Sequence, residues 1–263
     1  MKIKEVFEET LRKGKRVIIP YITGGFPDPC TFLELLECLQ EAGAGMIEVG
    51  VPFSDPIADG PVIQESSQKA LEMGMGLRKI LTLLIQNRHR VNVPLVLMGY
   101  YNPFFQMGID ELMRLAKEAD IKGFIVPDLP IEEAKDWTNK LKKENIDTIF
   151  LVAPTTSMER ARVIASFTTG FLYCISVTGV TGAREKLPEY LKDYLESLRK
   201  VTSLPRAVGF GISSPQQVRE ISPYAEGIVV GSALIKLIME TEKKEIYRRV
   251  RDFISSLVEA SHV

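Results

Sequence analysis

Residues 46–64 have the sequence Met46-Ile-Glu-Val-Gly-Val-Pro-Phe-Ser-Asp-Pro-Ile-Ala-Asp-Gly-Pro-Val-Ile-Gln64. The apolar run at the start of this stretch predicts a buried strand, and the segment after it, punctuated by proline and glycine, predicts a loop. Glu48 lies inside the strand, while Asp55 and Asp59 lie in the loop. Because an uncompensated buried charge is costly, Glu48 must be paired, protonated or used in chemistry. Two interpretations are open: a structural glutamate bonded to nearby backbone, or an acid–base group with a raised pKa.

The composition is typical of one large globular domain or two small ones. The chain has 263 residues, of which 45% are hydrophobic and 25% charged, with a net charge of -1. The near-neutral charge and the lack of a basic block argue against a nucleic-acid partner, and no apolar run approaches the roughly 18 residues of a membrane span. Residues 1–10 alternate charges in an amphipathic helical pattern, unlike the apolar segment of a signal peptide, so we expect a cytoplasmic location.

Cysteine usage adds a second compositional constraint. Cys30, Cys38 and Cys174 are odd in number and have no CxxC spacing. This pattern argues against a disulfide framework and against a zinc site. We expect three reduced thiols.

Short apolar segments alternate with longer amphipathic helical segments along the chain. Eight strands are predicted, over residues 16–21, 46–50, 95–100, 123–127, 148–152, 171–176, 206–210 and 227–230. Helices are predicted over residues 30–42, 63–86, 108–119, 131–144, 157–167, 187–201, 214–221, 232–239 and 244–260.

This alternation predicts the fold class. Continuous apolar strands covered by helices indicate a parallel sheet, and eight βα units in roughly 250 residues fit one closed (β/α)₈ TIM barrel. The helical patterns at the two ends add an N-terminal and a C-terminal helix. No linker divides the chain, so we expect a single domain over residues 1–263. An open doubly wound sheet is the alternative, which the absence of GxGxxG after the first strand weakens.

The chemistry of such a barrel lies at the C-terminal ends of its strands. The residues predicted there are Thr23, Glu48, Tyr100, Asn102, Asp128, Tyr173, Thr178, Gly211 and Gly231. They include no lysine for a Schiff base and no histidine, since His89 and His262 are predicted to lie on the surface away from this end. Without histidine or cysteine clusters a metal site is poorly supported. Metal-free acid–base chemistry by carboxylates and tyrosines is what remains.

Two long connections and two glycine-bearing turns complete the predicted site. The segments 52–61 and 178–188 are candidate lids, although either could be an ordinary surface loop. Glycines 209, 211 and 231 stand directly before predicted helices, where backbone N–H groups attract an anion. Glycine also suits any tight turn. At the last two strands of a barrel, however, the pair of turns predicts a phosphorylated substrate.

Seven segments, in order along almost the whole chain, resemble the family of tryptophan synthase α subunits. They are Pro20-Tyr-Ile-Thr-Gly-Gly25, residues 47–64 of the opening stretch, Met98-Gly-Tyr-Tyr-Asn-Pro103, Val126-Pro-Asp-Leu-Pro130, Gly179-Val-Thr-Gly-Ala-Arg184, Gly209-Phe-Gly-Ile-Ser213 and Val230-Gly-Ser-Ala233. The resemblance implies cleavage of indole-3-glycerol phosphate to indole and glyceraldehyde 3-phosphate, within tryptophan biosynthesis. It also implies that indole passes to a β subunit carrying pyridoxal phosphate, in an α2β2 heterotetramer, and that this chain holds no cofactor and no metal.

The resemblance assigns roles to individual residues. The catalytic glutamate and aspartate fall on Glu48 and Asp59, with Tyr173 near the glutamate. The phosphate-binding residues are Gly182, Gly211, Gly231 and Ser232; the indole pocket is Tyr21, Met98, Tyr100, Ile125 and Phe210; and Thr181 lies in the second lid. An exposed phenylalanine between prolines is typical of an interface anchor. We therefore expect the β subunit to dock on Pro52, Phe53, Asp55 and Pro56.

Two positions depart from the family pattern. Val177 stands where many members of the family carry arginine, and Tyr21 stands where phenylalanine is common, which adds a hydroxyl that needs a partner. Two other function classes stay open: an interaction protein that activates a β partner without cleaving substrate, and another phosphate-binding barrel such as indole-3-glycerol-phosphate synthase. The intact Glu48 and Asp59 argue against the first, and the lack of a strand-end lysine argues against the second.

Overall fold

The computed structural model describes residues 1–175, 189–209 and 211–263. Its strands are β1 (Val17–Thr23), β2 (Ile47–Gly50), β3 (Leu95–Met98), β4 (Ile121–Ile125), β5 (Asp147–Ile149), β6 (Leu151–Val152), β7 (Leu172–Ile175), β8 (Arg206–Gly209) and β9 (Gly227–Val230). Its α-helices are α1 (Ile3–Arg12), α2 (Pro29–Glu41), α3 (Pro61–Glu72), α4 (Leu77–Gln86), α5 (Tyr101–Met107), α6 (Ile109–Glu118), α7 (Lys135–Lys143), α8 (Met158–Phe167), α9 (Tyr190–Arg199), α10 (Pro215–Ile221), α11 (Ser232–Met239) and α12 (Ile246–Ala260).

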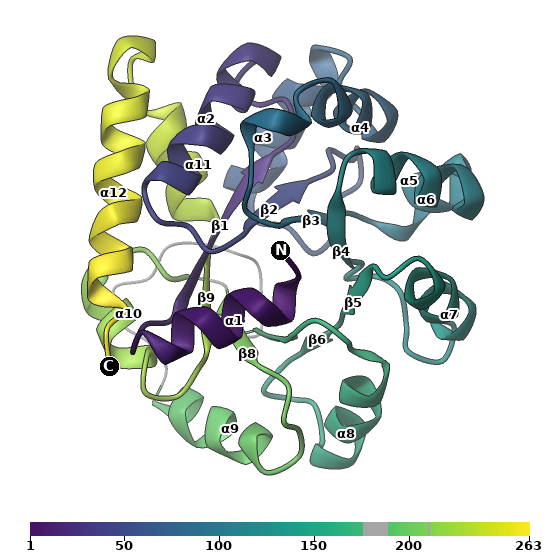
Figure 1. Cartoon of the computed structure of the whole chain (residues 1–263), viewed down its shortest axis with the longest axis vertical. Helices are drawn as coiled ribbons and strands as arrows, with labels where there is room; N and C mark the ends of the chain where they lie inside the picture. The colour runs from purple at the N-terminus through teal and green to yellow at the C-terminus, as the bar shows by residue number, and fades with distance from the viewer. Residues whose placement is uncertain (176–188, 210) are drawn as a thin grey trace.

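The strands form one closed parallel sheet. They are hydrogen-bonded in the order β5-β4-β3-β2-β1-β9-β8-β7-β6, and the two ends of this order, β5 and β6, are consecutive pieces of one strand on either side of Phe150. Tyr173 N donates to Phe150 O (3.0 Å), which continues the pairing of β7 across the break. Figure 1 shows the helices arranged around this ring of strands. The predicted TIM barrel is confirmed.

The strands are buried along their length, as the continuous apolar runs predict. Every residue of β1, β2, β3, β8 and β9 is buried. Parallel register sets Tyr21 of β1 beside Glu48 of β2, and Glu48 beside Val96 of β3. Glu48 therefore projects from a buried strand of the sheet.

The two terminal helices predicted from the sequence are present and have different roles. The first, α1, lies across the N-terminal end of the barrel, where Ile3 and Phe7 are buried against the strand region at Gly123 and Gly227 (Figure 1). The last, α12, packs on α2 and α10 at the periphery. None of the helices in the described ranges is both long and apolar enough to span a membrane.

The helix predicted over residues 63–86 is wrong, because it is two helices, α3 and α4. Between them Gly74 has a φ of +70°, a left-handed conformation that favours glycine, and Gly76 is the N-cap residue of α4. The apolar positions keep a helical period across this break, so periodicity alone could not detect it.

Smaller differences affect the third to fifth βα units. The strand predicted over residues 148–152 is interrupted at Phe150, because its first half pairs with β4 and its second half with β7. The short helix α5 was not predicted, and α7 begins at Lys135 rather than at residue 131. The predicted start of the helix now called α9 falls on residues 187 and 188, which lie outside the described residues.

Candidate active site

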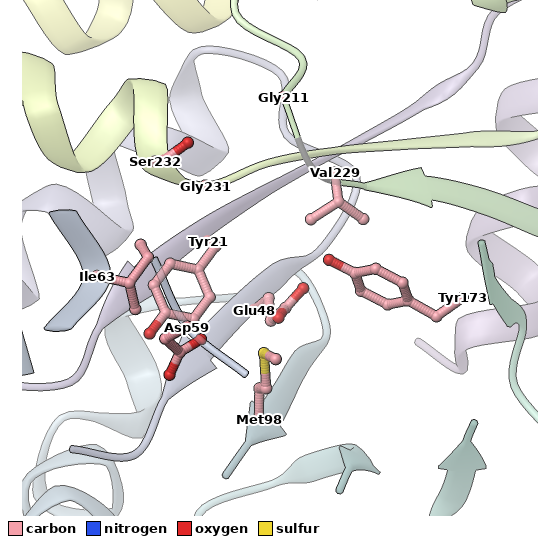
Figure 2. Close-up of a pocket in the computed structure, with 10 residues that line it drawn as sticks. All are labelled: Tyr21, Glu48, Asp59, Ile63, Met98, Tyr173, Gly211, Val229, Gly231 and Ser232. Carbon is pink, nitrogen blue, oxygen red and sulfur yellow. The ribbon is translucent and has the colours of Figure 1, made fainter. Parts of the chain in front are cut away.

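A pocket opens at the C-terminal end of the barrel, with a volume of about 420 Å³ that includes open solvent at its mouth. Figure 2 shows the residues that line it: Tyr21, Glu48, Asp59, Ile63, Met98, Tyr173, Gly211, Val229, Gly231 and Ser232. Eight of these ten were singled out from the sequence, and they come from both halves of the chain. Ile63 and Val229 could not be selected from the sequence, because an apolar residue at a strand end or helix start looks the same whether it lines a pocket or fills the core.

Glu48 is the buried acid of this pocket. It is 1% exposed, and neither of its carboxyl oxygens has a hydrogen-bond partner among the described residues. Burial raises the pKa of Glu48 to about 8, and the nearby negative charge of Asp59 adds to the rise. The interpretation of Glu48 as a structural glutamate bonded to nearby backbone therefore finds no support in the described part of the chain.

Asp59 enters the pocket from the loop between β2 and α3. Burial raises the pKa of Asp59 to about 6, while a hydrogen bond from Tyr100 opposes this rise. Tyr100 Oη donates to Asp59 Oδ2 at 3.1 Å. The two carboxyl groups thus have pKa values on either side of neutrality, so that near pH 7 Glu48 is mostly protonated and Asp59 mostly ionised. Such a separation is characteristic of acid–base sites.

Two tyrosine rings flank Glu48, as Figure 2 shows for Tyr21 and Tyr173. Each hydroxyl lies against a strand-end glycine: a Cβ on Gly50 would come within 2.0 Å of Tyr21 Oη, and one on Gly209 within 2.5 Å of Tyr173 Oη. Burial raises the pKa of both tyrosines, so they are neutral hydroxyls in the physiological range. The added hydroxyl of Tyr21 accepts a long hydrogen bond from Thr23 Oγ1 at 3.5 Å.

Three small residues, Gly211, Gly231 and Ser232, line another part of the pocket. Gly231 precedes α11 without a side-chain cap, and Ser232 is the first residue of that helix. Gly211 has a φ of +91°, a conformation that a side chain would strain. A helix start without a side-chain cap beside such a turn suits an anion. Three residues predicted for this region, Thr181, Gly182 and Phe210, lie outside the described residues, as does Val177.

Two residues predicted to line the indole pocket are not among its described lining. Ile125 is fully buried in β4. Tyr100 donates a hydrogen bond to Asp59 and is not among the residues that line the pocket. A residue at a strand end can line the pocket or pack in the barrel core around it, and the sequence pattern does not distinguish these two locations.

The predicted docking loop has a different exposed residue from the one expected. Pro52 is buried, and Phe53 is only partly exposed because its ring packs on Tyr100, with ring centroids 5.2 Å apart. The expectation of an exposed Phe53 is therefore wrong. Ile57, in the same loop, is 82% exposed. Phe105 on α5 is 65% exposed, and the sequence analysis singled out neither residue.

The polar residues that could bind metal are dispersed. Within the described ranges, no three histidine, cysteine, aspartate or glutamate residues form a potential metal-binding group. His89 and His262 are exposed, as predicted. The three cysteines are free thiols, with Cys30 exposed and the other two buried.

Comparison with known proteins gives the same family as the sequence motifs. A family model described as Tryptophan synthase alpha chain matches residues 7–261. The tryptophan synthase alpha chain of Petrotoga mobilis is 45% identical over 258 residues, which cover 97% of this chain and 98% of that protein. The structure of Mycobacterium tuberculosis tryptophan synthase matches with a TM-score of 0.91 at 32% identity, covering 99% of this chain and 98% of the other. Tryptophan synthase subunit alpha from Legionella pneumophila matches with a TM-score of 0.90 at 36% identity, covering 99% and 98%. The chain belongs to the tryptophan synthase alpha chain family.

Proposed function

We propose that this chain cleaves indole-3-glycerol phosphate by general acid–base catalysis, with Glu48 as the proton-transfer group and Asp59 as the partner of the indole N–H. The reaction is that of its family, a carbon–carbon lyase of tryptophan biosynthesis that releases indole and glyceraldehyde 3-phosphate. The observation that carries the residue assignment is the buried Glu48 carboxyl, which has no hydrogen-bond partner among the described residues and lies in a pocket that Gly211, Gly231 and Ser232 also line.

The proposed chemistry returns Glu48 to its starting state. Protonated Glu48 gives its proton to indole C3, which makes the ring an electron acceptor. The resulting carboxylate takes the proton of the hydroxyl next to the bond that breaks. As that O–H becomes a C=O, the carbon–carbon bond cleaves and its electron pair restores the aromatic indole. A pKa of about 8 suits both steps, since efficient proton transfer requires a pKa near the working pH.

Asp59 and the two tyrosines would act on charge and orientation. Protonation at C3 places positive charge on the indole nitrogen, and an ionised Asp59 accepting from that N–H would stabilise it. A group already held in a dry pocket needs little reorganisation to do so. Tyr173 would contact the reacting part of the substrate beside Glu48, and Tyr21 would pack on the indole together with Met98.

The phosphate would bind at the start of α11. Gly211, Gly231 and Ser232 lie on the same side of the pocket, and an anion there would interact favourably with the N-terminal end of that helix. Gly211, Gly231 and Ser232 lie apart from Glu48 in the pocket (Figure 2), as a substrate with an aromatic ring at one end and a phosphate at the other would require.

A β subunit is the proposed partner. Homologous structures are of tryptophan synthase, and an α2β2 assembly that passes indole to a pyridoxal-phosphate-bearing β subunit is consistent with a chain of this family. Ile57 and Phe105 are large apolar side chains exposed near the pocket end of the barrel, and such residues are typical of protein interfaces. We place the docking surface on these two residues together with the predicted Pro52, Phe53, Asp55 and Pro56. The cytoplasmic location is retained as a prediction from the composition.

The test is incubation of the purified chain with indole-3-glycerol phosphate, followed by measurement of released indole. Indole release with equimolar glyceraldehyde 3-phosphate is the expected result. An interaction protein would release none alone while still stimulating a β subunit, and an indole-3-glycerol-phosphate synthase would form this compound from its precursor without releasing indole. Either outcome would refute the proposal.

A further inference from the structure

One hydroxyl group at the end of β3 bonds to two successive residues of the loop that carries Asp59. Tyr100 is 4% exposed and is the N-cap residue of α5. Its Oη donates to Asp59 Oδ2 (3.1 Å) and accepts from Ala58 N (2.9 Å). The same atom therefore fixes both the carboxylate of Asp59 and the backbone immediately before it.

In the described part of the chain, residues 51–57 of this loop make one hydrogen bond to a barrel strand. Val51 N donates to Met98 O (2.7 Å) at its start, and Gln64 Nε2 donates to Asp59 O (2.9 Å) at its end. Between these points, the other hydrogen bonds that residues 52–57 make in the described structure stay within the loop. The ring of Phe53 packs on the ring of Tyr100. Tyr100 is thus the barrel side chain that contacts the loop at both its middle and its catalytic end.

We propose that Tyr100 is a positioning residue, which holds Asp59 where it meets the indole N–H and links that carboxylate to the Phe53 segment of the loop. This inference rests on the proposed function, because it takes Asp59 to be the partner of the indole nitrogen. It assigns to Tyr100 a role different from lining the indole pocket. Partner docking on the loop would then reach Asp59 through the ring and the hydroxyl of this one side chain.

The charge environment gives the inference a measurable consequence. Among the described residues, the titratable groups that face Asp59 are Glu48 from β2, Tyr21 from β1, Tyr173 from β7 and Tyr100 itself. Near pH 7 the first three are neutral, and Tyr100 is the one that donates a hydrogen bond to the carboxylate. Loss of a hydrogen bond to the charged form raises the pKa of a carboxyl group.

The experiment is Tyr100→Phe in the full chain, with kcat/KM for indole-3-glycerol phosphate measured from pH 5 to pH 9. Phenylalanine keeps the ring that packs on Phe53 and removes only the two hydrogen bonds. We expect the acid limb, which reports Asp59, to move up by about one pH unit, while the basic limb, which reports Glu48, stays in place. A merely structural role would lower activity at every pH and leave both limbs where they are, which would overturn the proposal.

Two controls isolate the hydroxyl. Tyr101→Phe makes the same change at the next residue, whose ring contacts Phe105 and Trp137, and should leave both limbs unchanged. In an Asp59→Asn background, adding Tyr100→Phe should change kcat/KM less than twofold, because the two groups act as one unit. If Tyr100→Phe lowered kcat/KM by the same factor in the Asp59→Asn background as in the unmodified chain, the two effects would be independent and the inference would be contradicted.

A second readout separates this inference from the proposed function. The pKa of Asp59 can be followed by carbon-13 NMR of its carboxyl carbon, in the chain without substrate. Tyr100→Phe should raise that pKa even if the chain releases no indole. An unchanged Asp59 resonance titration would refute the positioning role, whereas absent indole release by the unmodified chain would refute the reaction alone.

Discussion

Each end of the barrel buries an ionisable side chain, but only the one at the base has a hydrogen-bonded charge partner among the described residues. At the mouth, Glu48 is 1% exposed and has no hydrogen-bond partner among the described residues. At the base, Arg206 is 2% exposed and donates through Nε and Nη2 to Glu226, at 3.1 and 2.6 Å, and through Nη1 to Leu195 O at 2.6 Å. Burial without a partner raises the pKa of Glu48, whereas the charge of Arg206 is neutralised by Glu226.

The difference follows from what each end must do. A buried charge is tolerated when it is paired and fully hydrogen-bonded, and removing one partner is then strongly destabilising. A buried carboxyl without a partner instead takes up a proton, which reduces its cost and makes it a reagent. In barrels of this kind the C-terminal end carries chemistry and the N-terminal end carries stability. We therefore expect substitutions at the two ends to affect different measurements.

The largest expected effect is on turnover, from Glu48→Gln. Glutamine keeps the size of the side chain but cannot transfer a proton, so turnover should fall by about 10²- to 10⁴-fold. Single-turnover indole release measures the chemical step directly. The matched control is Glu72→Gln, the same change at an exposed glutamate of α3, which should leave turnover unchanged. Near-normal turnover of Glu48→Gln would show that Glu48 does not transfer a proton in the reaction, and the mouth of the barrel would then not differ from the base in this way.

The next effect is on stability, from Arg206→Ala at the base. Loss of the guanidinium leaves Glu226 without its main partner, and breaking such a pair costs about 3–5 kcal/mol. Urea unfolding should show this loss, while kcat of the folded variant at 25 °C should stay within about twofold of the unmodified chain. Arg248→Ala, which removes an exposed pair with Glu245, is the control and should leave the unfolding midpoint nearly unchanged. A large fall in kcat for Arg206→Ala would show that the two ends are not separable.

A smaller effect concerns the pH dependence of stability. Folded Glu48 keeps its proton up to a pKa of about 8, whereas a glutamate in the unfolded chain loses it at about pH 4.3. Between these values the unfolded state binds fewer protons, so stability falls as pH rises and levels off above the folded pKa. Glu48→Gln should lack this decline and be more stable than the unmodified chain by a few kcal/mol at pH 8.

Chemical unfolding of both proteins at pH 5, 6.5 and 8 measures that difference. Asp59 contributes a similar decline over a lower range, up to its folded pKa of about 6, and does so in both proteins. The stability gap between them should therefore widen steadily with pH. A gap that stays constant would mean that folded Glu48 releases its proton near its ordinary pKa.

The smallest effect is on partner activation and concerns the outside of the mouth. Docking a β subunit on the loop would favour the competent position of Asp59, so its addition should raise the indole release rate. Phe53→Ala should reduce this activation more than it reduces the basal rate, and Ile57→Asp should weaken β-subunit binding by about tenfold. Val163→Asp, at an exposed valine on α8, is the control for a surface charge. Equal rates with and without excess β subunit would exclude this coupling.

The sequence by itself determined the barrel and most of its chemistry. Continuous apolar strands alternating with helices allow few folds, and a carboxylate inside such a strand has few explanations, so Glu48 could be selected from residues 46–64 alone. The choice of Asp59 over Asp55 in the loop that follows came from the family resemblance. The glycines at the last two strand ends could be selected in a similar way, because backbone N–H groups at a helix start attract an anion and barrels commonly bind phosphate there.

Only the tertiary structure decided how these groups are supported. Tyr100 could be placed at a strand end, but whether it faces the pocket or bonds to Asp59 depends on how the 51–60 loop folds back over β3. The partial exposure of Phe53 and the greater exposure of Ile57 depend on the same path. The interruption at Phe150 depends on which neighbour each half of the strand pairs with. These features depend on contacts between distant segments, which local periodicity does not encode.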